Sequence, residues 1–135
     1  MWRRFLINGN MTIAQLGYAV LRIFRANGSY LFNIEKPLQK GVATLYEMPN
    51  TNIDISDLDM NIIERYDATK EQIHSVVSLN DKDNQLIINY DFGNDWRIKL
   101  KLEEIYGENN LKNNYIPCVI FGKCLWNYRG LWWYT

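Results

Sequence analysis

Apolar residues recur along this chain at two different spacings, and each spacing predicts a different kind of element. Short apolar runs and apolar–polar alternation predict strands at residues 2–7, 30–35, 41–46, 85–90 and 96–102. The last two are separated by a polar segment with a glycine, residues 91–95, which is typical of a hairpin turn. We therefore expect neighbouring antiparallel strands to form most of a sheet.

One segment has the spacing of an amphipathic helix. Its apolar residues fall on one face, namely Ile13, Leu16, Val20, Ile23 and Phe24. Thr12 and Gln15 form a capping box at its start, and the Asn-Gly pair at 27–28 is expected to end it. The same box pattern at Thr69 and Gln72 predicts a second, short helix that reaches about residue 77.

The remaining segments complete the predicted fold. Residues 48–59 and 80–84 are polar and predict a loop and a turn, residues 60–66 fit neither period, and residues 115–121 fit a strand or an extended tail. Several strands with two helices in this order predict an α+β two-layer sandwich. It would have a mostly antiparallel sheet with one long and one or two short helices packed on it. A chain of 135 residues is typical of a single domain, here 1–135.

Net charge and cysteine content limit the expected partners and the expected cellular compartment. Fifteen basic and fifteen acidic side chains cancel, which argues against a dedicated nucleic-acid or membrane-surface binder. The apolar run at the start is too short for a signal peptide or a membrane span, which predicts a cytoplasmic protein with no membrane partner. Cys118 and Cys124 are then expected to be reduced thiols. A homodimer is compatible with this charge balance, because near-neutral proteins associate more readily.

Few residues have the types and spacing that catalysis or metal binding requires. Asp91 and Asp95 are expected to hold their own turn through hydrogen bonds to its backbone. The alternative is that they form, with Cys118, the site of an enzyme of unknown reaction. His74 is the only histidine, and a lone histidine on a short helix is expected at the surface. Without ligand clusters at metal-binding spacing, we expect no metal, no cofactor and no catalytic residue.

Basic residues follow one face of the strand predicted at 96–102. Together with two arginines from a possible neighbouring strand they form a patch of five residues, Arg3, Arg4, Arg97, Lys99 and Lys101. Such a patch can follow a phosphate backbone while nearby aromatic rings stack on bases. This makes a nucleic-acid-binding module the main alternative function. An ordinary solvated strand face explains the same residues, and the acidic pair at 103–104 weakens the patch.

Large aromatic residues are concentrated in the last ten positions. They stand beside an arginine in the set Trp126, Tyr128, Arg129, Trp132, Trp133 and Tyr134. Trp, Tyr and Arg dominate binding energy at protein interfaces, so this set is the candidate partner-binding site. Two interpretations remain open: the rings dock on the core of their own domain, or they present an exposed patch to a partner.

The hairpin segment also identifies a family. Residues Tyr90–Trp96 have the sequence Tyr-Asp-Phe-Gly-Asn-Asp-Trp, which resembles the Tyr-Asp-Phe-Gly-Asp-x-Trp signature of the plasmid pRiA4b ORF-3-like family. A first strand with Trp2-Arg3-Arg4, a helix at 16–24, the segment Tyr30–Ile34 and the segment Tyr115–Cys118 resemble other parts of the family in the same order. The chain is thus identified as a diverged member.

The departures from the family pattern bear on function. The resemblance places two histidines and a Glu-Asp pair of relatives at positions that are occupied here by Tyr30, Ile98, Asn127 and Tyr128. General acid–base catalysis and metal binding both need such groups. We therefore expect a non-catalytic intracellular binding protein that acts through contacts with another protein. The family's association with mobile elements implies a phage- or plasmid-encoded inhibitor of a host system.

Overall fold

A computed structural model describes residues 2–23, 32–49, 61–80, 83–90, 96–105, 118–119 and 129–134. Side chains are described for 4–23, 32–49, 61–80, 83–90 and 97–105. The strands are β1 Trp2–Ile7, β2 Phe32–Pro37, β3 Val42–Glu47, β4 Asn61–Asp67, β5 Gln85–Tyr90, β6 Trp96–Glu104, β7 Cys118–Val119 and β8 Arg129–Tyr134. The helices are α1 Ile13–Ile23 and α2 Ile73–Val76, with a 3-10 turn at Gln39–Gly41.

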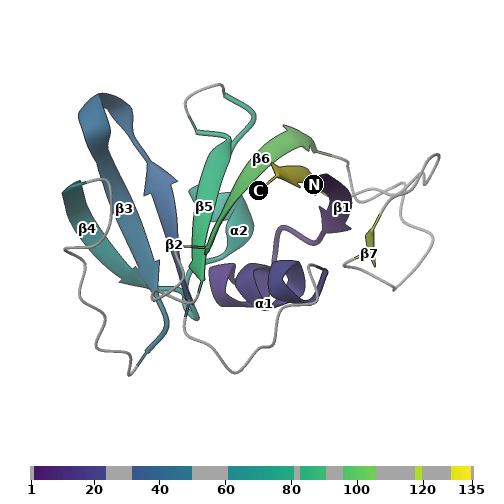
Figure 1. Cartoon of the computed structure of the whole chain (residues 1–135), viewed down its shortest axis with the longest axis horizontal. Helices are drawn as coiled ribbons and strands as arrows, with labels where there is room; N and C mark the ends of the chain where they lie inside the picture. Colours follow the sequence, from purple (N-terminus) through teal and green to yellow (C-terminus); the bar gives the residue numbers. More distant parts are fainter. Residues whose placement is uncertain are drawn as a thin grey trace.

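The strands form one mixed sheet in the order β4-β3-β2-β5-β6-β8-β1-β7 (Figure 1). The β3–β4 pair is parallel, and the other neighbours are antiparallel. This confirms the α+β class. The last described strand, β8, was not predicted. It lies between β6 and β1, so the two ends of the chain lie side by side in Figure 1, with Trp2 opposite Tyr134.

The predicted hairpin is confirmed in its strands. β5 and β6 pair in a regular antiparallel register from Gln85 opposite Lys101 to Tyr90 opposite Trp96. Its turn, with Asp91 and Asp95, lies outside the described residues. The strand expected at 30–35 is observed at Phe32–Pro37, so it ends two residues later than predicted. The sequence left the segment 60–66 open, and its described residues belong to the strand β4, Asn61–Asp67.

The edge strand β4 is interrupted by a bulge. The β3–β4 register shifts between Ala43 and Thr44, which pair with Ile62 and Glu64 and leave Ile63 without an opposite residue. Ile63 is 56% exposed, and Glu64 and Arg65 follow it. Bulges and charges are devices that protect an exposed sheet edge against pairing with another chain. The β4 edge is therefore built to resist strand addition.

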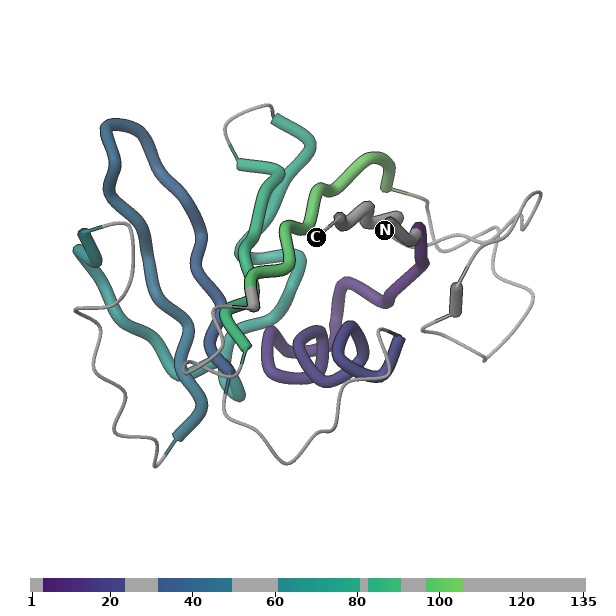
Figure 2. Tube along the Cα trace, in the orientation of Figure 1, coloured from purple at the N-terminus to yellow at the C-terminus, as the bar shows by residue number. Residues whose placement is uncertain are grey.

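Helix α1 begins with the predicted capping box. The backbone N–H of Gln15 donates to Oγ1 of Thr12 at 3.1 Å, and the backbone N–H of Thr12 donates to Oε1 of Gln15 at 2.8 Å. These bonds satisfy donors that a helix start otherwise leaves without partners. The face that carries Ile13, Leu16 and Val20 is buried, as predicted. The tube in Figure 2 shows α1 passing beneath the strands of the sheet.

The capping box predicted for the second helix is wrong. Helix α2 begins at Ile73, and its N-cap residue Gln72 makes no capping bond. Both the hydroxyl and the backbone N–H of Thr69 donate to Oδ1 of Asp67, at 2.6 and 2.9 Å. The first-turn amides of α2 donate instead to the backbone carbonyls of Met11 and Gly9, both at 2.9 Å. The chain segment before α1 therefore takes over the role of the cap.

Both helices contribute to one hydrophobic core on one face of the sheet. The strands contribute alternate residues to it, and these include Phe5, Phe32, Ile34, Tyr46, Leu86, Ile88, Ile98 and Leu100. Because side chains alternate across a strand, the residues between them belong to the opposite face. That opposite face carries the candidate site.

Close packing of α1 on β2 predicts a penalty for a single added methyl group. A Cβ at Gly17 would lie 2.2 Å from the ring of Phe32, which is buried and packs edge-on against Tyr18 at 5.1 Å. Gly17→Ala improves helix propensity by about 1 kcal/mol, but overpacking costs about 1–3 kcal/mol. We expect a net loss of about 1 kcal/mol in urea unfolding. The double variant with Phe32→Leu should recover stability; a gain from Gly17→Ala alone would contradict this packing.

The buried Tyr46 predicts a loss of stability at alkaline pH. Burial, followed by the charges of Glu71, Tyr66 and Glu64, raises the pKa of Tyr46 to about 12. An unfolded tyrosine titrates near pH 10. Between about pH 10 and 12 the unfolded chain releases a proton that the folded chain retains, so stability falls as pH rises. At pH 11.5 the loss should be about 1–2 kcal/mol, because one pKa unit corresponds to about 1.4 kcal/mol and solvent screens part of the shift. Urea unfolding at pH 8 and 11.5 should show a smaller fall for Tyr46→Phe; equal falls would exclude this cause.

Candidate binding face

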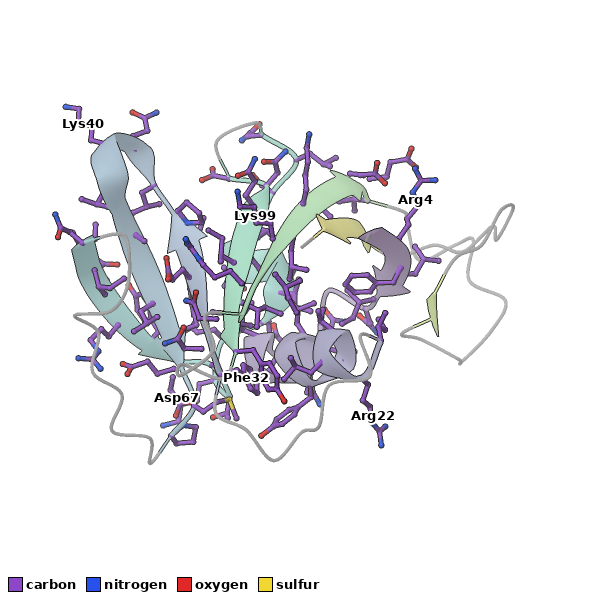
Figure 3. The ribbon with its side chains drawn as sticks, viewed as in Figure 1. Arg4, Arg22, Phe32, Lys40, Asp67 and Lys99 are labelled. Atoms are coloured by element: carbon purple, nitrogen blue, oxygen red, sulfur yellow. The ribbon has the colours of Figure 1, made fainter. Side chains whose placement is uncertain are left out.

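The sheet face opposite the helices carries most of the charged and polar strand residues. We call it the polar face and define it by Arg4, Asn33, Glu35, Leu45, Glu47, Ile87, Asn89, Arg97, Lys99 and Lys101. These positions alternate with core residues along β1, β2, β3, β5 and β6. In Figure 3, Lys99 and Arg4 lie in the upper half of the view, whereas Phe32 and Arg22 lie near α1 in the lower half.

A buried polar network occupies the centre of this face. The Asn89 amide donates to Oδ1 of Asn33 at 2.8 Å and to Oε1 of Glu35 at 2.5 Å. All three residues are buried, with Asn33 and Glu35 fully so. Among the described residues, Nδ2 of Asn33 and Oε2 of Glu35 have no hydrogen-bond partner. Because buried polar groups are costly without partners, Asn89 holds β2 and β5 together at this point.

An ion pair between β3 and β4 lies at one side of the polar face. Arg65 on β4 donates to both carboxylate oxygens of Glu47 on β3, at 2.6 and 2.5 Å. The hydrogen bonds to Glu47 raise the pKa of Arg65 above its usual value. Glu47 pairs in register with Asn33, so this ion pair lies beside the buried network. The two hydrogen bonds fix the orientation of the Arg65 guanidinium. They also occupy both carboxylate oxygens of Glu47.

The cations of β6 form the exposed part of the face. Lys99 and Lys101 are exposed, Arg97 is half-buried, and they alternate with the buried Ile98 and Leu100, as predicted for a strand with one solvated face. The two lysines make no hydrogen bond or ion pair with the residues that the structure describes. Their charges are thus available to an external partner.

Arg4 is in a different situation from the two lysines. Its Nε lies 3.2 Å from Oε2 of Glu103. Burial raises the pKa of the Glu103 carboxyl, and the charge of Arg4 offsets part of that rise. Glu103, near the end of β6, therefore offsets the charge of Arg4 and leaves the positive charge of the patch on the earlier residues of β6.

A shallow pocket opens beside the lysines. Its volume is about 190 Å³, and it is lined by Pro37, Gln85, Leu86, Ile87, Lys99, Leu100 and Lys101. Its walls come from three adjacent strands, β2, β5 and β6. Small-molecule sites usually measure about 300–1,000 Å³. This pocket is therefore large enough to hold only part of a larger ligand.

The five predicted basic residues do not all share this face. Directly opposite residues in an antiparallel pair lie on the same side of the sheet. Arg4 is opposite Trp132, which is opposite Lys101, so these positions share the polar face. Arg3 is opposite Trp133, which is opposite the core residue Leu100, so Arg3 belongs to the other face. The strand β8 also separates β1 from β6, which the sequence did not predict.

The predicted C-terminal aromatic set is divided by the same register. Trp132 and Tyr134 fall at polar-face positions, and Tyr134 is opposite Lys99. Trp133 falls at a core-face position, opposite Leu100. Arg129 begins β8 opposite Ile7, while Trp126 and Tyr128 lie outside the described residues. The backbone that carries these rings is paired on both sides within the sheet.

The other candidate groups do not converge in the described part of the chain. His74 is exposed, as predicted, and its ring bonds the Gln72 side chain at 2.7 Å. Cys118 lies opposite Leu6 at the sheet edge, and Cys124 is outside the described residues. Within the described ranges, no three His, Cys, Asp or Glu residues come together as metal ligands. No described helix is long and apolar enough to cross a bilayer.

Sequence reasoning missed the buried network. Asn33, Glu35 and Asn89 alternate with apolar residues and therefore resembled an ordinary solvated face. The available signal was the apolar pair Leu45 and Ile87, which the register places on either side of Glu35. That signal depends on strand order, which cannot be obtained from the spacing within one strand.

Comparison with known proteins identifies the family of this chain. A family model for plasmid pRiA4b ORF-3-like proteins matches residues 1–125. The chain belongs to the plasmid pRiA4b ORF-3-like family. This pRiA4b ORF-3-like protein matches no curated protein and no solved structure. The family match includes β6 with its cations and ends before β8.

Proposed function

We propose that this pRiA4b ORF-3-like protein is a non-catalytic binding protein that docks an anionic partner on its polar face. The observation that supports the proposal is the pair Lys99 and Lys101. Both are exposed, neither is bonded to a described residue, and an open pocket lies beside them. Unpaired cations beside a pocket attract negatively charged ligands.

The dimensions of the pocket favour a partner larger than a metabolite. A pocket of about 190 Å³ open to solvent cannot enclose a whole small molecule to the extent that tight sites do. A polymer or a protein surface can instead contact the pocket and the exposed side chains beside it together. The affinity then comes from several contacts spread over Gln85, Lys99 and Lys101.

A lack of catalysis is part of the same proposal. Ile98 is buried in the hydrophobic core, at a position where the family resemblance places a histidine. Tyr30, Asn127, Tyr128, Asp91 and Asp95 lie outside the described residues. A buried isoleucine cannot transfer a proton or bind a metal, which supports binding over turnover.

The two-layer arrangement fits this role. We propose that the helices cover one face of the sheet, as in a two-layer sandwich, and that the partner contacts the exposed lysines at the margin of the polar face. An acidic protein surface is one partner that would fit the exposed lysines. Contact with another protein therefore agrees with this proposal and stays a prediction. The role of a mobile-element inhibitor of a host system also stays a prediction. Loss of host-system inhibition on Lys99→Glu/Lys101→Glu would be its specific test.

Charge reversal at the two lysines tests the proposal directly. Fluorescence anisotropy would measure binding of labelled anionic probes: a polyglutamate peptide, a single-stranded oligonucleotide and a duplex. We expect Lys99→Glu/Lys101→Glu to weaken binding at least about tenfold, because each buried or partly desolvated charge contact contributes more than 1 kcal/mol. The matched control is Lys40→Glu/Lys70→Glu, which makes the same charge change at exposed positions off β6.

Two results would contradict the proposed function. One is that no anionic probe binds the unmodified protein at low salt. The other is that both double variants lose binding equally, which would show a response to net charge alone. A thermal melt of each variant checks that the fold is retained.

A further inference from the structure

We infer that the anionic partner is an acidic peptide segment of another protein, with carboxylates paired to Lys99 and Lys101 and an apolar side chain in the pocket beside them. This inference rests on the proposed function, because it names the partner of the same two lysines. It adds a second observation, which is a break in the pairing of β2 with β5 at the pocket.

The pocket opens where the pairing of β2 with β5 stops. β2 pairs with β5 only as far as Glu35, which lies opposite Ile87. β5 pairs with β6 further along, to Gln85 opposite Lys101. Strand β2 ends at Pro37, and residues of all three strands line the pocket of about 190 Å³. The pocket therefore lies at an interruption of the sheet, which we call the β2–β5 break.

Backbone groups of Pro37 and Gln85 face each other across this break. Successive residues of a strand direct their N–H and C=O groups to opposite neighbours. The N–H of Leu38 donates to the carbonyl of Val42 at the start of β3, at 2.8 Å, so the groups of Pro37 face β5. The carbonyl of Asn84 accepts a bond from β6 at 2.8 Å, so those of Gln85 face β2. Proline has no N–H, which denies the Gln85 carbonyl the donor that regular pairing would supply.

The side chains around the break combine apolar surface with unpaired positive charge. Pro37 and Ile87 line the pocket together with the two lysines. Lys99 and Lys101 are exposed and make no hydrogen bond or ion pair with the residues that the structure describes. An aliphatic side chain in the pocket would bury apolar surface, and a carboxylate next to it would pair with a lysine.

An extended peptide matches the spacing of these groups. Alternate side chains of an extended chain lie on one side, about 7 Å apart. Lys99 and Lys101 have the same spacing on β6, so carboxylates at alternate peptide positions can reach both. A peptide also has backbone N–H groups that can donate to the carbonyl of Gln85. Main-chain hydrogen bonds combined with side-chain pockets are an established way to recognise extended peptides.

A nucleic acid matches the same groups less well. Phosphodiester oxygens have no proton to donate to the carbonyl of Gln85, and they gain nothing from contact with Pro37 or Ile87. A longer run of phosphates along β6 would also approach the carboxylate of Glu103, which follows Lys101 on this strand. Two free lysines next to an apolar pocket therefore favour a short acidic segment with one apolar residue.

Fluorescence anisotropy with matched peptides tests the inference. The first peptide has a central leucine with four glutamates on each side, and the second has serine in place of that leucine. A labelled single-stranded oligonucleotide is the third probe. We expect the leucine peptide to bind at least about tenfold more tightly than the serine peptide, because only leucine buries apolar surface in the pocket. It should also bind more tightly than the oligonucleotide.

Pro37→Ala separates the β2–β5 break from the charges. Alanine supplies an N–H opposite Gln85, so that β2 and β5 can pair further and close the pocket. We expect the advantage of the leucine peptide over the serine peptide to fall from about tenfold to about twofold, because less apolar surface is then buried. Pro49→Ala, at an exposed proline after β3, is the matched control and should leave the advantage unchanged.

Gln85→Lys provides a second variant if Pro37→Ala fails to fold. It adds a third cation to the pocket lining and should strengthen binding of the leucine peptide about threefold or more, as expected for an added charge contact at an interface. Asn61→Lys makes the same charge change at an exposed position of β4 and should have little effect. A thermal melt of each variant checks that the fold is retained.

The outcomes distinguish the inference from the proposal beneath it. Equal affinity for the leucine and serine peptides would overturn the inference and leave the anionic docking site intact. Tighter binding of the oligonucleotide than of the leucine peptide would do the same. An unchanged leucine advantage in folded Pro37→Ala, or an unchanged affinity in Gln85→Lys, would also overturn it. If no anionic probe binds at all, the proposed function itself fails.

Discussion

Deletion of residues 129–135 is expected to unfold the domain rather than trim its end. The strand β8 lies inside the sheet, paired with β6 on one side and with β1 on the other. Removing it leaves two long rows of backbone N–H and C=O groups without partners. It also detaches β1, which supplies Phe5 and Ile7 to the core. Such a loss exceeds the total stability of a typical domain, about 5–15 kcal/mol.

Far-UV circular dichroism and urea unfolding would measure the effect. We expect the truncated chain to show no cooperative transition, while removal of Thr135 alone should leave the midpoint nearly unchanged. Leu131→Pro offers a milder version, because a proline inside a central strand removes a ladder hydrogen bond. A truncated chain that unfolds cooperatively at the original midpoint would show that β8 is not part of the sheet.

Local features of the fold were predictable from the sequence because neighbouring residues determine them. The box of Thr12 and Gln15 satisfies its donors within one turn, so its residues are sufficient to place the start of α1. The β5–β6 hairpin is likewise a local structure, and its alternation fixes which residues are buried. Distant residues do bond at the start of α1, where the N–H groups of Ile13 and Ala14 donate to the carbonyls of Glu71 and Ala68, but the two bonds of the capping box remain in place.

Long-range competition explains the features that were missed. Thr69 has the pattern of a cap, but Asp67 takes its hydroxyl, and the amides of α2 find carbonyls near α1. The pairing of β8 with both β1 and β6 joins segments about 130 and about 30 residues apart, and no spacing within the aromatic segment indicates it. Strand order is a property of the whole sheet.

The candidate site was predictable only in its charges. The alternation of Arg97, Lys99 and Lys101 with core residues is a period-two pattern that the structure retains. The sequence could not show that Arg4 joins them while Arg3 does not, because this depends on the register with β8. The positions of β8 that lie opposite Lys99 and Lys101 likewise follow only from this register.

Asn89→Ala is expected to destabilise the protein by about 3 kcal/mol or more. The Asn89 amide is the donor to both Asn33 and Glu35, and all three are buried. Its removal leaves a buried carboxylate and a buried amide oxygen without that donor. Leaving such groups unsatisfied costs about 1–3 kcal/mol each, and more for a charged group. Urea unfolding would measure the loss, and Gln85→Ala, at an exposed position on the same strand and face, should change stability by less than about 0.5 kcal/mol.

A triple variant identifies the cause of that loss. Replacing Asn33, Glu35 and Asn89 together by leucine removes the buried polar groups along with their donor, and such exchanges are often neutral or stabilising. We therefore expect the triple variant to be more stable than Asn89→Ala, although it differs from the natural chain at more positions. If the triple variant is the less stable of the two, the network stabilises the sheet through its shape and packing, and the unsatisfied carboxylate of Glu35 is not the source of the cost.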